Sequence, residues 1–187
     1  MASDPTPNQP AIADSISDVV SLERHFEDVL DLQITIDAAP AIISTIHDTV
    51  HDSRMRAEDF RESYSDSPAM SVLKQDLDLL GKAISLIESV RKETISNSLR
   101  NDFVACNLAA VSYSMLHTTA IALENEDVAA FAAEGLRTYA RLITEIGIAL
   151  PSAVVRELVG TSGAESIDAN AAAIATSQQQ GLWSPRS

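Results

Sequence analysis

Apolar side chains recur every three or four residues along most of this chain, a spacing that places them on one face of an α-helix. A first helix is predicted to open at Asp14 or Ser15, and a second at Asp37, which can serve as an N-cap with Pro40 in the first turn. The predicted stripes are Val19, Leu22, Phe26, Val29 and Leu30 in the first helix, and Ile43, Ile46, Val50, Ala57, Phe60 and Tyr64 in the second. Each helix therefore has one face to bury.

The strongest periodic signal follows Ser67-Pro68, a second cap-and-proline pair. Leucine and isoleucine then alternate in steps of four and three, at Leu73, Leu77, Leu80, Ile84 and Ile87. This spacing predicts a third helix with an apolar seam, ending near Ser96.

The stretch 98–150 is expected to organise the rest of the chain. It predicts two long Ala-rich helices, 101–123 and 126–149, joined by the tight polar turn Glu124-Asn125. The first is apolar or small almost all round, with Phe103, Val104, Leu108, Val111, Met115 and Leu116. The second has Leu136, Tyr139, Ile143, Ile146 and Leu150 on one face. We expect this hairpin to be buried on several sides and covered by the other helices.

Pro151 is expected to end or kink the hairpin, with a short additional helix over 152–159 and Gly160 as its C-terminal cap. No alternating strand pattern occurs, so the sequence predicts an all-α fold, an up-down four-helix bundle with an additional helix. The expected organisation is a disordered leader over 1–14, a helical bundle over 15–160 and a flexible Ala/Ser/Gln-rich tail over 161–187. An isolated apolar patch ending in Trp183 lies near the end of that tail.

Composition narrows the class of protein. The formal net charge of −14 argues against nucleic-acid binding, which depends on Lys and Arg side chains. The lone Cys106 requires no oxidising compartment, and neither a signal peptide nor a membrane span is recognised. We therefore expect a cytoplasmic protein that binds no membrane.

His47 and His51 lie one turn apart in a pattern that resembles the zinc-protease motif, but the intervening acid is Asp48 where that motif has Glu. Glu58 falls on the same flank of the predicted helix, so these two histidines and Glu58 form a candidate metal site for iron or zinc. The alternative is ordinary contact at the edge of the buried stripe.

Other catalytic arrangements are not evident in the sequence. The Glu-x-x-His pairs of a di-iron bundle are absent, and Glu23 and Glu88 are the only acids that fall near an inward stripe. Cys106 lies mid-helix among apolar residues, which favours a buried structural thiol over a nucleophile. No catalytic, cofactor-binding or metal-ligating residue is therefore assigned, and an enzyme is disfavoured.

The hairpin resembles the last two helices of the ferritin-like YciE/YciF family. The resemblance rests on Tyr113-Ser114-Met115-Leu116, on the run 120–123, on the acidic turn Glu126-Asp127 and on the return helix from Ala129 to Leu136. Where that family would present Glu and His, this chain has Cys106, Asn107 and Ala109, and Glu134 is turned away from the apolar stripe. The resemblance implies a ferritin-like bundle that has lost its metal ligands, with a function related to stress.

Three functions remain open from the sequence. The first is a non-catalytic ferritin-like bundle that acts through protein association, as a homodimer or with another protein. The second is a divergent metal-binding bundle that uses His47, His51 and Glu58. The third is a small acidic adaptor, immunity protein or chaperone.

Overall fold

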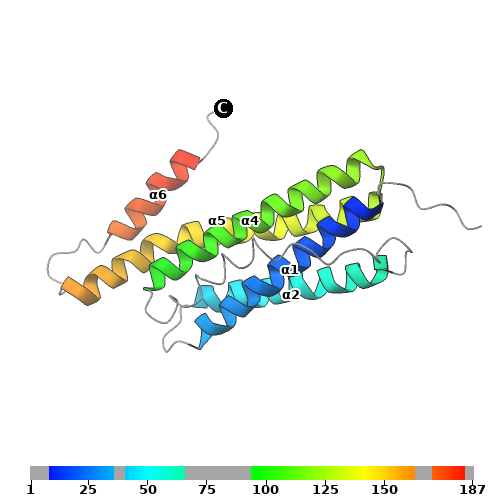
Figure 1. Cartoon of the computed structure of the whole chain (residues 1–187). Helices are drawn as coiled ribbons and strands as arrows, with labels where there is room; N and C mark the ends of the chain where they lie inside the picture. The colour runs from blue at the N-terminus through cyan, green and yellow to red at the C-terminus, as the bar shows by residue number, and fades with distance from the viewer. Residues whose placement is uncertain (1–8, 36–40, 66–93, 163–169, 184–187) are drawn as a thin grey trace, which may run out of the picture.

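The computed structural model describes residues 9–35, 41–65, 94–162 and 170–183, and all of its regular structure is helical. The described helices are α1 (Gln9–Ile34), α2 (Ala41–Ser65), α4 (Ile95–Ala122), α5 (Glu126–Ser162) and α6 (Ala171–Trp183) (Figure 1). The predicted all-α class is thereby confirmed. Within the described ranges, no helix is both long and apolar enough to span a membrane.

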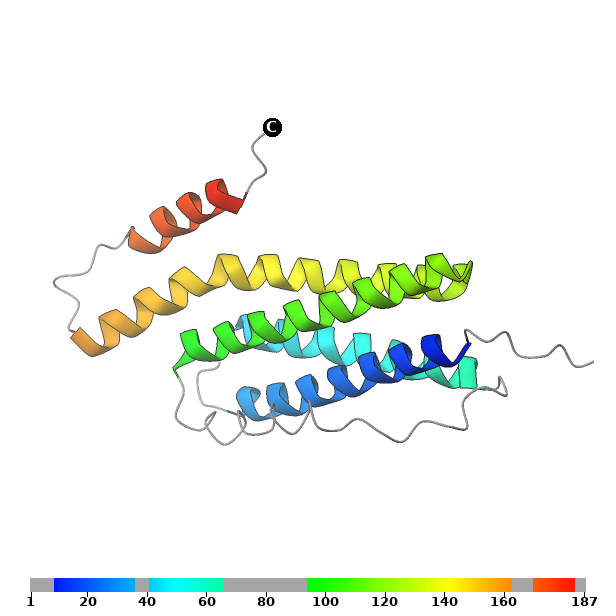
Figure 2. The same ribbon diagram turned by 45° about the horizontal axis from the view of Figure 1, so that its top comes forward.

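Four of the helices form a bundle in which helices that pack against each other run antiparallel (Figure 2). Helix α1 packs against α2 and α4, and α5 packs against α4 and α2, so the four helices close a ring (Figure 2). Helices α2 and α4 lie on opposite sides of this ring and run in the same direction. The apolar stripes meet at its centre, where Leu30, Ile46, Leu116, Leu142 and Ile146 are fully buried.

Helix α1 begins at Gln9, five to six residues before the predicted start at Asp14 or Ser15. The predicted disordered leader 1–14 is therefore wrong for its last six residues. The apolar stripe extends into this stretch, where Ile12 and Ala13 are buried. Pro10 falls in the first turn, where its missing N–H has no intrahelical partner to lose.

The predicted third helix lies almost entirely in residues 66–93, outside the described residues, and so does the predicted cap of the second helix at Asp37. The expected end near Ser96 is wrong, because Ser96 already belongs to α4. Thr94 caps α4 by accepting a hydrogen bond from the Asn97 N–H. Glu157 of α5 accepts two more, from the Ser96 N–H at 2.7 Å and the Ser96 Oγ at 2.6 Å. A carboxylate at a helix N-terminus suits its positive dipole end, which explains the earlier start.

The polar turn Glu124-Asn125 is confirmed between α4 and α5. Glu124 adopts φ 54, in the left-handed region. Asn125 then caps α5, because its Oδ1 accepts a hydrogen bond from the Val128 N–H at 3.1 Å. The three residues Leu123, Glu124 and Asn125 are therefore enough to reverse the chain.

Helix α5 continues through Pro151 to Ser162, so the predicted end of the hairpin and the separate helix 152–159 are wrong. Proline removes the hydrogen bond to the carbonyl of Gly147. Pro151 and Ala153 are buried against the bundle, and this packing offsets the lost bond. Tertiary contact overrides the local signal.

The predicted flexible tail contains α6, a helix that packs against α5 outside the four-helix bundle (Figures 1 and 2). Its start at Ala171 suits the local run of three alanines, the best helix formers. The expectation of a structureless tail is wrong over 171–183.

The outer face of α4 differs from the expectation of a helix buried on several sides. Val104, Leu108, Val111 and Met115 are exposed at 62%, 54%, 55% and 66%. We call these four residues the outer α4 stripe. The opposite face, with Cys106, Ala109, Tyr113 and Leu116, is buried.

Replacing Glu124 tests the turn. Glu124→Gly should raise the free energy of unfolding by about 1 kcal/mol, because glycine adopts positive φ without the steric cost of a Cβ. Asn125→Ala should lower it by about 1 kcal/mol, because the α5 cap is lost. Urea denaturation of both variants measures the difference, and equal effects of the same sign would contradict this account of the turn.

Candidate functional site

One buried polar cluster draws a side chain from each of the four bundle helices. Glu23 of α1 is 0% exposed. Its Oε1 accepts hydrogen bonds from Ser53 Oγ of α2 at 2.6 Å, Tyr113 OH of α4 at 2.9 Å and Tyr139 OH of α5 at 2.9 Å. We call these four residues the Glu23 cluster.

Helical periodicity brings these residues together. Glu23 lies on the same stripe as Val19, Phe26 and Leu30, which places its carboxylate inside the bundle. Tyr139 lies on the apolar face of α5, three residues before the buried Leu142. Each hydroxyl therefore reaches the centre from a helix whose inward face is mostly apolar.

Gly135 makes room for one of the tyrosines. A Cβ at this position would overlap the ring of Tyr113, so the ring lies directly on the α5 backbone. The Tyr113 ring also packs against Tyr139, with centroids 5.8 Å apart, and against Phe131 at 5.7 Å. Phe131 in turn stacks on Phe60 of α2, at 4.2 Å. The aromatic residues thus hold the tyrosine hydroxyls in place.

Burial governs the proton equilibria of the cluster. Desolvation raises the pKa of Glu23, although the hydrogen bonds from Ser53, Tyr113 and Tyr139 oppose it. Burial, with the Glu23 carboxylate nearby, also raises the pKa of both tyrosines. Among the described residues, Oε2 of Glu23 has no hydrogen-bond partner. The charged form of Glu23 is therefore stabilised on one oxygen only.

The cluster's chemistry suits structure better than catalysis. The tyrosine hydroxyls act as neutral donors, and their raised pKa values disfavour the phenolates that would ligate a metal. Glu23 is the only carboxylate in the cluster, and its Oε1 is already saturated. Across the described ranges, no group of three or more His, Cys, Asp and Glu residues gathers as metal ligands would.

A ladder of ion pairs joins α1 to α2 at the surface. His47 Nε2 lies 2.9 Å from Asp31 Oδ1, and His51 Nδ1 lies 2.6 Å from Glu27 Oε1. Burial lowers the pKa of His47, but hydrogen bonds to Asp48 and Asp31 outweigh it and raise the pKa overall. These pairs fix the register of the two helices.

Arg54 extends the ladder. It pairs with Glu27 and, at 2.7 Å, with Glu58. Arg24 Nη2 lies 2.5 Å from Glu58 Oε1, and this bond is the largest influence lowering the pKa of Glu58. Burial tends to raise the pKa of Glu27, but Arg54 and His51 outweigh it and lower the pKa.

Each of the three candidate metal ligands of the sequence is therefore engaged by other side chains. His47 and His51 do lie together, with stacked rings 6.4 Å apart. Each of them faces a carboxylate of α1, and Glu58 is held by two arginines. The guanidinium groups of Arg24 and Arg54 occupy the Glu58 carboxylate oxygens that a metal ion would need.

The remaining sequence candidates take structural positions. Cys106 is buried, and its pKa is raised by burial and by nearby Asp102, which disfavours the thiolate. Glu134 points away from the core and pairs with Arg137 at 2.6 Å, as the helical wheel predicts. Glu88 lies outside the described residues.

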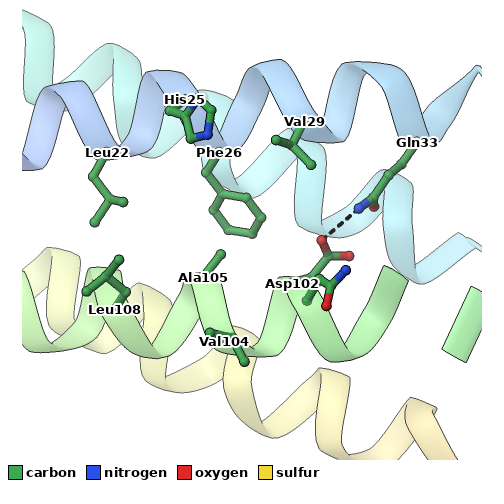
Figure 3. A pocket seen from close by; sticks show the side chains of 10 residues that line it. Leu22, His25, Phe26, Val29, Gln33, Asp102, Val104, Ala105 and Leu108 are labelled. Atoms are coloured by element: carbon green, nitrogen blue, oxygen red, sulfur yellow. Dashed lines mark hydrogen bonds between the residues drawn. The ribbon is translucent and has the colours of Figure 1, made fainter. Parts of the chain in front are cut away.

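A groove of about 200 Å³ lies between α1 and α4 (Figure 3). Apolar side chains of Leu22, Phe26, Val29, Val104, Ala105 and Leu108 line most of it. Gln33 Nε2 donates a hydrogen bond to Asp102 Oδ1 at 2.9 Å near one end, and both side chains are buried. We call this feature the α1–α4 groove.

Sequence reasoning found Glu23 as an inward acid but missed its three partners. An acid in phase with an apolar stripe predicts a buried carboxylate, which needs donors. Tyr113, Tyr139 and Ser53 could have been singled out as the hydroxyl-bearing residues on inward faces. Their convergence depends on the relative rotation of four helices, which no local pattern encodes.

Comparison with protein-family models, with curated proteins and with solved structures found no match. No family match therefore supports the resemblance to the YciE/YciF family, which rests on the residue pattern alone.

The contact between Gly135 and Tyr113 can be tested with a matched glycine. Gly135→Ala should lower the free energy of unfolding by about 1–3 kcal/mol, because the added methyl displaces the Tyr113 ring. Gly147→Ala in the same helix meets nothing within 4 Å and should be stabilising by about 0.5–1 kcal/mol. Chemical denaturation measures both, and a stable Gly135→Ala protein would disprove the contact.

The raised pKa of Glu23 predicts a pH dependence of stability. Its pKa in the folded state lies above the ordinary value of 4.5, so the folded state holds this proton more tightly than the unfolded state. The contribution is fully present below pH 4.5 and is lost as the pH rises through the folded-state pKa. Relative to Glu23→Gln, the natural protein should lose about 1.4 kcal/mol for each unit by which the pKa is raised.

Urea titrations of both proteins between about pH 4 and 8 measure this difference. The comparison cancels the opposite contribution of Glu27 and Glu58, whose pKa values are lowered. A difference independent of pH would show that Glu23 titrates normally.

Proposed function

We propose that this protein is a non-catalytic, ferritin-like helical bundle that acts through protein association, first of all with a second copy of itself. The observation that carries the proposal is α6, an uncharged helix that lies outside the bundle and ends at Trp183.

The topology supports the ferritin-like part of the proposal. Helices α2 and α4 run in the same direction, so α2 ends and α4 begins at opposite ends of the bundle, and the connection between them has to span its length (Figures 1 and 2). Ferritin-like bundles have one long crossover of this kind, whereas simple up-down bundles have short loops throughout.

The bundle centre supports the non-catalytic part. A reacting group would need access and a free proton-transfer or ligand position, but the Glu23 cluster is buried and its hydroxyls already donate to one carboxylate oxygen. The Cys106 thiol is buried too, with a pKa raised by burial. These interior groups stabilise the fold, which leaves the surface for function.

Helix α6 supports association. Residues 171–183 contain no Asp, Glu, Lys or Arg, in a chain of net charge −14. None of its described side chains is buried, and Ile174 is 48% exposed. A helix of 13 residues is only marginally stable by itself in water and is normally stabilised by packing against other parts of the protein. A second copy offers the same uncharged helix, so two copies can meet there without bringing their acidic surfaces together.

Deleting 171–187 tests this function. The full chain should form a dimer in light scattering coupled to size-exclusion chromatography, and the deletion should weaken self-association at least tenfold. The melting temperature should change by less than about 2 °C, because α6 contributes nothing to the buried core. Deletion of 184–187 alone, which leaves α6 intact, is the control. A full-length chain that stays monomeric at high micromolar concentration, or a deletion that leaves the dimer intact, would refute association through α6.

A further inference from the structure

The outer α4 stripe and the α1–α4 groove form one continuous apolar surface of the described bundle. Val104 and Leu108 belong to both. The α4 sequence from Phe103 to Ala122 contains no Asp, Glu, Lys or Arg, in a chain with 21% charged residues. An exposed apolar surface without charge marks a contact site. We propose that residues 69–92 of this same chain dock on it as an amphipathic helix.

The ends of the two described helices on either side of residues 66–93 support this segment as the occupant. Helix α2 ends at Ser65, at the end of the bundle where α4 also ends, and α4 begins at the opposite end (Figure 2). The connection from Ser65 to Ile95 therefore has to span the length of the bundle. A helix over 69–92 would be about 36 Å long, close to the roughly 37 Å of α2 with its 25 residues.

The periodicities of the two sequences match. The outer α4 stripe has steps of four, three and four, and Leu73, Leu77, Leu80 and Ile84 have the same steps. Matching stripes on antiparallel helices interdigitate as knobs in holes. Val72, Leu79 and Leu86 form a second apolar line on the adjacent flank of the same helix, a line that can face α1 across the groove.

The position of Thr94 sets the register. Thr94 is the N-cap of α4, so a reversal at Thr94 pairs residues at equal distances on either side of it. The resulting pairs are Leu73 with Met115, Leu77 with Val111, Leu80 with Leu108, and Ile84 with Val104. All four residues of the outer α4 stripe receive an apolar partner. The same register places Glu88 level with Arg100, a favourable pair of opposite charges.

Cysteine cross-linking of the full chain tests the contact and its register. Leu77→Cys combined with Val111→Cys should form an intramolecular disulfide under mild oxidation, seen by mass spectrometry after non-reducing digestion. Asp78→Cys with Val111→Cys is the matched control, because residue 78 lies on the opposite face of the same helix. The first pair should cross-link at least tenfold faster. Native Cys106 is buried, and its thiolate is disfavoured, so it can remain in place.

A second pair, Leu73→Cys with Met115→Cys, tests the register near the other end of α4 and provides a readout if the first variant folds poorly. Intramolecular disulfides in both apolar pairs, faster than in the control, support the proposal. Equal rates in apolar and control pairs would overturn it. Disulfides formed only between two chains would also overturn it, because a second copy would then occupy the surface. Self-association through α6 is measured separately by light scattering, so the two proposals fail independently.

Discussion

The fold depends on the buried carboxylate of Glu23, which three other helices must satisfy. Glu23 cannot enter an apolar interior without donors, and Ser53, Tyr113 and Tyr139 supply them from α2, α4 and α5. A hydrogen bond to a charged group contributes about 1.5–3 kcal/mol to the free energy of unfolding. Removing one donor leaves a buried polar atom without a partner, which costs at least as much. Any rotation of one helix about its axis would break one of these bonds. The cluster therefore selects one arrangement from the many that apolar packing alone would allow.

Surface electrostatics complement this constraint. The pairs that His47, His51 and Arg54 form with acidic residues of α1 fix the axial position of α2 relative to α1. Partly exposed ion pairs contribute little stability individually, but they oppose wrong registers. The histidines that first suggest a metal site thus serve the packing of two helices. The strongly acidic chain neutralises part of its charge where helices meet and leaves α6 and the outer α4 stripe uncharged.

Apolar periodicity predicted that α2, α4 and α5 are helices, because apolar residues in them repeat with the period of the helix. It did not predict which face of α4 is buried. The Glu124-Asn125 turn was predictable because a cap and a tolerated left-handed residue are local features. The helix through Pro151, the early starts at Gln9 and Ile95, and α6 were not predicted. At Pro151 and at the early helix starts, contacts with other parts of the chain outweigh the local sequence signal. At the start of α4, for example, Glu157 of α5 accepts two hydrogen bonds from Ser96.

The sequence by itself determined the all-helical class, the central hairpin, the acidic surface and the inward position of Glu23, because each follows from composition or from spacing within one helix. Only the tertiary structure decided which hydroxyls meet Glu23, which carboxylate pairs with His51, which arginines pair with Glu58, and which face of α4 stays open. These features depend on the rotation, the offset and the crossing of helices far apart in the sequence. Contacts at a separation of 116 residues, as between Tyr139 and Glu23, leave no periodic trace in either segment.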